Sequence, residues 1–123
     1  MDERTRSKFD RLWSSDGDSR YRAFNDILEA TDGEVGWAYE VWDDLVAKLQ
    51  SKDNHYRAIA AQVLSNLAKS DPLNRMLRDF PALLAATRDE RFVTARHCLQ
   101  AIWKVGVAGE KQQGRKNEPT IRN

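Results

Sequence analysis

The sequence contains little cysteine, little proline and no long apolar run. Among its 123 residues there is one cysteine, so no internal disulfide can form and nothing indicates an oxidising compartment. No run approaches the roughly 18 apolar residues that cross a bilayer, and the first eight residues are too charged for a signal peptide. We therefore expect a cytoplasmic protein with no membrane partner.

Residue types that carry catalysis or bind metals are also scarce. His55, His97 and Cys98 are too few for a tetrahedral metal site at the usual spacing. His97 and Cys98 are adjacent, and adjacent residues of a helix point in different directions, so they do not form a nucleophile and base pair. We expect no metal, no cofactor and no enzymatic activity.

A short phrase recurs along the chain. The segment DSRYRAF begins at residue 18, DNHYRAI begins at residue 53, and the fainter DERFVTA begins at residue 89, so the phrases lie 35 and 36 residues apart. Intervals of this length are typical of stacked helical repeats, in which one helix pair cannot bury its apolar face without the next. The content of 41% hydrophobic and 32% charged residues fits such a soluble domain.

Apolar residues at three- and four-residue steps predict helices throughout this domain. The expected helices cover residues 9–13, 18–31, 34–50, 55–69, 72–87 and 91–107, all approximate. Asp18 or Ser19 is the expected N-cap of the second helix, Pro72 is placed in the first turn of the fifth, and Pro81 is expected to kink that helix or start a new one.

The end of the chain has a different composition. Residues 109–123 contain one aliphatic residue, Ile121, and cannot bury enough surface to offset the entropy of ordering. We therefore expect a helical repeat domain over residues 1–108 and a polar, flexible tail over residues 109–123.

The middle of the chain resembles the armadillo repeat. Residues 60–68, AAQVLSNLA, are similar to the A-L-x-N-L-A phrase in the last helix of that repeat, and residues 71–84 resemble the proline-started helix that follows it. Asp53 and Arg57 look like the turn aspartate and following arginine of the related HEAT repeat, a spacing that Asp18 and Arg22 share.

The resemblance covers three units, about residues 5–107. It implies an all-α fold, a right-handed superhelix of about three armadillo/HEAT-like repeats, whose second helices line a concave groove for an extended peptide or partner protein. The third unit departs from both patterns, because Val93 stands where the arginine is expected and Lys104 where the asparagine is expected.

Asn66 occupies the position of the armadillo asparagine. In that family this residue binds the backbone of a bound peptide, since its amide both donates and accepts. The first unit has Ala30 near this position and the third has Lys104, so no ladder of asparagines exists. We favour a structural or solvent-facing role for Asn66, with peptide binding as the alternative.

Charge is distributed unevenly along the chain. Residues 1–53 hold 8 Lys and Arg against 13 Asp and Glu, whereas residues 54–123 hold 12 against 6. Solvated charge is the ordinary explanation, but a stack in chain order would have an acidic end and a basic end. Self-association through open ends of the stack is therefore a further expectation.

Together these patterns favour a non-catalytic scaffold that binds a protein or peptide through the concave face or open ends of the stack. The alternative is nucleic-acid binding, in which the basic C-terminal half contacts phosphates as it does in HEAT-like DNA repair proteins. Trp13 and Trp42 are expected in the core. Trp37 and Trp103 are the two tryptophans to look for at the surface, although packing in the core or between repeats is the favoured interpretation for both. The residues expected to contact a partner are Arg57, Asn66, Lys69, Arg91, Arg96, Trp103 and Lys104.

Overall fold

The computed structural model describes residues 1–86 and 103–106. This part of the chain is all-α, as the sequence predicts, with six helices within residues 1–86 and no strand. Residues 103–106 are also helical. The expected tail over residues 109–123, most of the expected last helix, and the site candidates Arg91 and Arg96 lie outside the described residues. The six helices are α1 (Glu3–Arg11), α2 (Gly17–Ala30), α3 (Ala38–Lys48), α4 (Asn54–Leu67), the short 3-10 helix η1 (Ala68–Ser70) and α5 (Arg75–Ala86).

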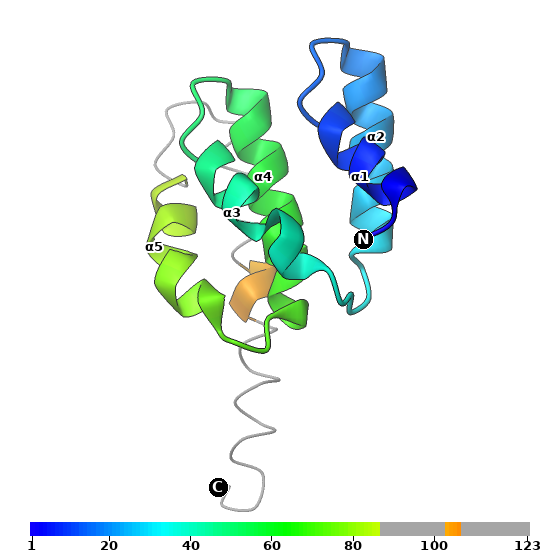
Figure 1. Cartoon of the computed structure of the whole chain (residues 1–123). Helices are drawn as coiled ribbons and strands as arrows, with labels where there is room; N and C mark the ends of the chain where they lie inside the picture. Colours follow the sequence, from blue (N-terminus) through cyan, green and yellow to red (C-terminus); the bar gives the residue numbers. More distant parts are fainter. Residues whose placement is uncertain (87–102, 107–123) are drawn as a thin grey trace, which may run out of the picture.

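The helices pack as pairs that lie side by side in chain order. Helix α1 packs against α2, and α3 packs against α4. Contacts of α2 with α4, and of α3 and α4 with α5, then join each pair to the next element, so that α5 lies on the opposite side of the α3–α4 pair from α1 and α2 (Figure 1).

The turn between α1 and α2 has a specific set of hydrogen bonds. The backbone N–H of Asp16 donates to the Ser14 hydroxyl oxygen at 3.0 Å, and the Arg20 guanidinium donates to the Ser14 carbonyl oxygen at 3.0 Å. Asp16 has extended backbone angles and is the N-cap of α2. The predicted N-cap at Asp18 or Ser19 is therefore wrong. Ser14 closes the turn, and α2 has its N-cap at Asp16 instead.

The turn between α3 and α4 repeats this arrangement. The N–H of Asp53 donates to the Ser51 hydroxyl oxygen at 3.1 Å, and the Arg57 guanidinium donates to the Ser51 carbonyl oxygen at 2.7 Å. Each position is 37 residues beyond its counterpart in the first turn, rather than the 35 that the sequence phrase indicates. The phrase aligns Tyr21 with Tyr56, but Tyr21 is exposed, whereas Tyr56 is half-buried and donates to the carbonyl of Trp13.

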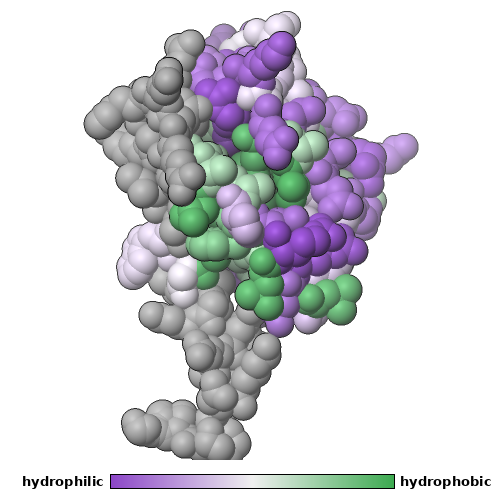
Figure 2. Space-filling view, turned by 90° about the vertical axis from the view of Figure 1, so that its left-hand side faces the viewer, coloured by the Kyte–Doolittle hydropathy of each residue, from purple (hydrophilic) through white to green (hydrophobic). Residues whose placement is uncertain are grey.

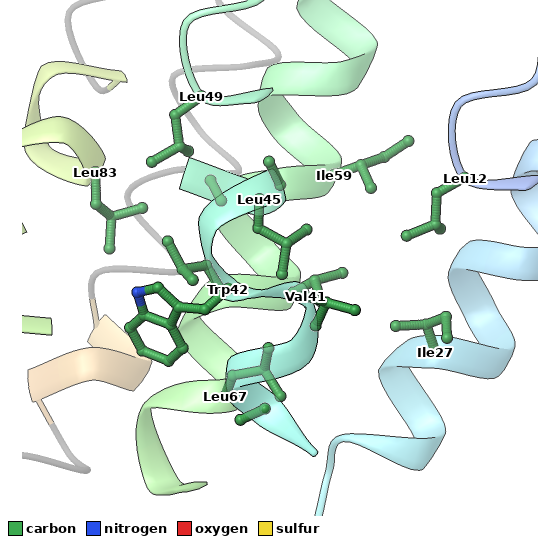
Figure 3. Close-up of a cluster of buried hydrophobic side chains, with 14 of the residues drawn as sticks. Leu12, Ile27, Val41, Trp42, Leu45, Leu49, Ile59, Leu67 and Leu83 are labelled. Carbon is green, nitrogen blue, oxygen red and sulfur yellow. The ribbon is translucent and has the colours of Figure 1, made fainter. Parts of the chain in front are cut away.

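The core lies between the helix pairs. Leu12 and Ile27 point from the α1–α2 pair toward Val41 on α3, and Leu83 points from α5 toward the same interior (Figure 3). Burial of this apolar surface is the main favourable term in folding. Trp42 is fully buried, which confirms its predicted place in the core. The partly buried Trp13 packs edge-on against Tyr56 at 5.4 Å between ring centroids, beneath the Lys48 ammonium.

Helix α5 differs from its sequence prediction at two points. It begins at Arg75 rather than at Pro72, because Asn74 adopts a left-handed backbone conformation with φ 53° that separates the proline from the helix. It then continues through Pro81 to Ala86. Pro81 is exposed, so solvent can satisfy the carbonyl that its missing N–H leaves without a partner. No new helix therefore begins at Pro81.

Candidate interaction surface

Two of the basic residues expected at a partner surface hold the ends of helices. The Arg57 guanidinium binds the turn before α4, as described above. The Lys69 ammonium donates to the backbone carbonyl of Asp32, just beyond the end of α2, at 2.5 Å. Lys69 therefore joins the α3–α4 pair to the α1–α2 pair, whereas Arg57 fixes the turn within the α3–α4 pair. Both side chains are half-buried.

Asn66 and Lys104 are brought into direct contact. The Asn66 amide donates to the Thr31 hydroxyl at 3.0 Å, and its oxygen accepts from the Lys104 ammonium at 3.0 Å. Thr31 in turn donates to the carbonyl of Ile27 at 2.7 Å. Asn66 is 4% exposed, so both ends of its amide are engaged inside the chain. This is the geometry of a residue that links α2, α4 and residues 103–106.

The two tryptophans considered for the surface have different environments. Trp103 is 68% exposed. Trp37 is half-buried and packs edge-on against Phe9, with 5.5 Å between ring centroids, where the start of α3 meets α1. Among the residues expected to contact a partner, Trp103 therefore presents an open aromatic ring to solvent.

The buried carboxylate of Asp71 caps the start of α5. It accepts the N–H groups of Arg75 and Met76, both at 2.8 Å, and also a hydrogen bond from the Tyr39 hydroxyl. Tyr39 accepts the N–H of Leu73 at 2.8 Å, and burial together with Asp71 raises the pKa of its phenol. These bonds satisfy N–H groups that a helix start otherwise leaves open, and they fix α5 against α3.

A second buried carboxylate, Asp79, joins the same two helices further along. It accepts from the indole N–H of Trp42 at 2.8 Å and from the Arg78 guanidinium at 2.8 Å. Arg78 reaches on to Asp43 of α3 at 3.2 Å. The Arg78 hydrogen bond, with that of Trp42, lowers the pKa of Asp79 despite its burial. The carboxylate is therefore ionised and fully used in packing α3 against α5.

Sequence reasoning missed the exposed leucines of this region. Leu73 is 70% exposed and Leu77 is 79% exposed, although helical periodicity alone places both among buried residues. The positions 37 residues earlier hold Gly36 and Glu40, both exposed. A comparison of positions 37 residues apart would have identified the two leucines as exposed, because their counterparts in the preceding helix pair face solvent and are not apolar. The face of the molecule on the α5 side shows hydrophobic surface directly beside strongly hydrophilic surface (Figure 2).

Residues 1–86 and 103–106 contain no group of three or more His, Cys, Asp or Glu side chains placed to hold a metal ion. No helix within these ranges is long and apolar enough to span a membrane. No family model, no curated protein and no solved structure matches this chain.

Proposed function

We propose that this chain is a non-catalytic protein interaction module, an armadillo/HEAT-like stack of about three helix pairs that binds a partner polypeptide. The repeated turns around Ser14 and Ser51 support the stack, because the same bonds return 37 residues later. The start of α5 at Arg75, which is 37 residues beyond the start of α3 at Ala38, supports a third unit of the same length.

The observation that carries the binding role is the exposure of Leu73 and Leu77 beside fully engaged polar groups. Large apolar side chains that gather on a soluble domain commonly mark a protein contact. The buried polar side chains nearby, Asp71, Asp79 and Asn66, serve the fold. A rigid helical surface binds without the cost of ordering itself, so its affinity depends on complementary side chains.

The nucleic-acid alternative remains a prediction. Of its basic residues, Arg57, Lys69 and Lys104 donate to oxygen atoms of this chain, and Arg91 and Arg96 lie outside the described residues. No feature of the described part favours a phosphate ligand over a polypeptide.

The proposed function is tested by recovery and reconstitution of the partner. The full chain is immobilised and exposed to extract of the cells that produce it, with and without nuclease treatment. Any polypeptide retained is purified and titrated calorimetrically against the chain. We expect one polypeptide that binds with a fixed stoichiometry. An unrelated protein with the same tag is the control. Retention that disappears after nuclease treatment, or the absence of any polypeptide that saturates the chain, would contradict the proposal.

A further inference from the structure

We infer that two copies of this chain associate through the outer row of α5, in an antiparallel two-fold contact. The outer row consists of Leu77, Pro81 and Leu84. This inference goes beyond the proposed function, because it needs no partner other than the chain itself, although both involve Leu77.

The outer row lies on one face of α5. Its residues are four and three positions apart, the spacing at which helical residues share a face, and all three are exposed, Leu77 by 79% and Leu84 by 41%. The opposite face of the same helix buries Met76, Leu83 and Ala86. A helix that is apolar on both faces is ordinarily covered on both. The α5 side of the molecule accordingly shows hydrophobic surface (Figure 2).

The equivalent rows of the two other helix pairs are polar. The residues 37 positions earlier, on α3, are Glu40, Asp44 and Ala47. The residues a further 37 positions earlier, on α1, are Glu3, Ser7 and Asp10. All of these side chains are exposed. Large apolar residues therefore gather at this outward position on α5 alone of the three helices, which is typical of a specific contact rather than of scattered surface residues.

The outer row has the same composition when it is read from either end. A leucine stands at each end, and a smaller proline stands between them. In a two-fold contact, residue i of one copy meets residue j of the other, while j meets i. An antiparallel copy of α5 therefore places Leu77 against Leu84 of the second copy, with Pro81 near the axis, where its short ring lets the two helices approach.

The charges beside the outer row also favour a second copy over a charged partner. Arg78 contacts Asp43 of α3 at 3.2 Å, and 60% of the Arg78 side chain and 76% of the Asp43 side chain are exposed. Arg75 is directed at α3, since its guanidinium lies 4.0 Å from the centre of the Tyr39 ring. A border with one exposed cation beside one exposed anion gives neither an acidic nor a basic partner an advantage. Two copies bring two such pairs together, so opposite charges remain matched across the contact.

Other occupants fit the outer row less well. Residues 109–123 contain one aliphatic residue, Ile121, which is too few to cover a row of three apolar side chains. An added β-strand has no sheet edge to pair with in the part of the chain that the structure describes.

The dimer is expected to be weak, because one helix packed on one helix is at the small end of protein interfaces. Sedimentation equilibrium of the purified full chain should show conversion from monomer to dimer with a Kd of about 10–500 μM. A chain that remains monomeric at about 1 mM overturns the inference.

Variants then locate the contact. Leu77→Gln with Leu84→Gln is expected to raise the dimer Kd at least about tenfold, because central apolar anchors supply most of the energy of a contact. Asp44→Gln with Ala47→Gln changes the equivalent row of α3 and is the matched control, with no expected effect. Circular dichroism verifies that each variant is folded. An unchanged Kd in the leucine variant, or an equal rise in the control, overturns the inference.

A thiol at the predicted axis tests the antiparallel geometry. Pro81→Cys brings the thiols of two copies close together, so a short bismaleimide should link them. Ser7→Cys places a thiol at the equivalent exposed position of α1, and the parent chain, which has Cys98, gives the background. We expect several-fold more linked dimer from Pro81→Cys than from either control. Equal linking in all three overturns the two-fold contact.

A different occupant gives a different result. If the chain dimerises only after residues 109–123 are removed, the tail covers the outer row and the inference fails. The proposed function is judged separately, because these measurements use the chain alone. A monomeric chain that still retains a polypeptide from the extract refutes the inference and leaves the proposed function standing. A dimer that behaves as expected but retains no polypeptide supports the inference and refutes the proposed function.

Discussion

Single residues hold this molecule together through polar contacts that cross between helices. The indole of Trp42 and the carboxylate of Asp79 form such a contact, buried between α3 and α5. Their sequence positions show no recognisable motif, because the pair depends on how two helices separated by more than 20 residues meet. A buried donor or acceptor left without its partner costs more than the bond itself contributes, so these contacts are sensitive to substitution.

Replacing Trp42 with phenylalanine tests the bond to Asp79. The ring remains apolar and fills most of the site, but the N–H donor is lost and the buried carboxylate keeps only Arg78. We expect the free energy of unfolding to fall by about 2–4 kcal/mol, from the lost bond and the smaller ring. Urea unfolding monitored by circular dichroism measures it. A loss below about half a kcal/mol would show that water replaces the hydrogen bond that the indole donates to Asp79.

Acid should reveal the same contact through Asp79. Its pKa lies below the ordinary value of 3.8, held there mainly by the Arg78 hydrogen bond and also by Trp42, against the effect of burial. The unfolded chain therefore takes up this proton first as pH falls. The stabilisation is complete well above pH 3.8 and decreases as pH falls through this value toward the folded pKa.

Asp79→Asn removes this dependence. We expect the difference in unfolding free energy between the original chain and the variant to be greatest near neutral pH and to shrink below about pH 4. Urea titrations at a series of pH values measure it. Two curves that stay parallel across this range would mean that Asp79 has the same pKa in both states.

At the scale of elements, the sequence predicts where helices exist better than where they begin. The apolar periodicity correctly predicts that helices exist where α2, α3 and α4 are found, since burial of one face dominates their stability. Two predicted starts are wrong: α1 begins at Glu3 rather than near residue 9, and α3 begins at Ala38 rather than near residue 34. The N-cap of α2 and the start of α5 are also missed, because they depend on the serine-closed turn at Ser14 and on the left-handed Asn74. Neither feature has a strong signal in the sequence.

The candidate surface was predictable only in part. The place of Trp103 beside the apolar stripe made it a surface candidate, but packing was favoured, and its exposure comes from the structure. The contact between Asn66 and Lys104 requires knowing that their helices are neighbours. Leu73 and Leu77 were missed because a helical period says which residues share a face and not whether that face is covered. The 37-residue register, visible only once the turns are known, supplies that information.

The two equivalent N-caps offer a matched experiment on the elements. Asp53 accepts the N–H of His55 at 2.8 Å, whereas Asp16, 37 residues earlier, makes no side-chain cap bond. We expect Asp53→Ala to lower the free energy of unfolding by about 1 kcal/mol and Asp16→Ala to lower it by only a few tenths. Thermal unfolding of both variants measures the difference. Equal losses would show that the side-chain bond is not what stabilises the start of α4.

At the scale of the whole molecule, contacts between the helix pairs hold the described helices together. Lys69 reaches from the end of α4 to the end of α2, and Arg78 reaches from α5 to α3. Buried apolar side chains fill the interior between the helices (Figure 3). In the proposed stack of repeats, each unit depends on its neighbours to bury its apolar face. The exposed leucines Leu73 and Leu77 lie just before α5 and at its start.

The most direct measurement of the binding claim is amide hydrogen exchange of the full chain, alone and saturated with its purified partner polypeptide. We expect added protection in the peptides that cover Leu73 and α5, with α1 and α2 exchanging as in the free chain. Unchanged exchange throughout the chain, or protection confined to α2, would contradict it.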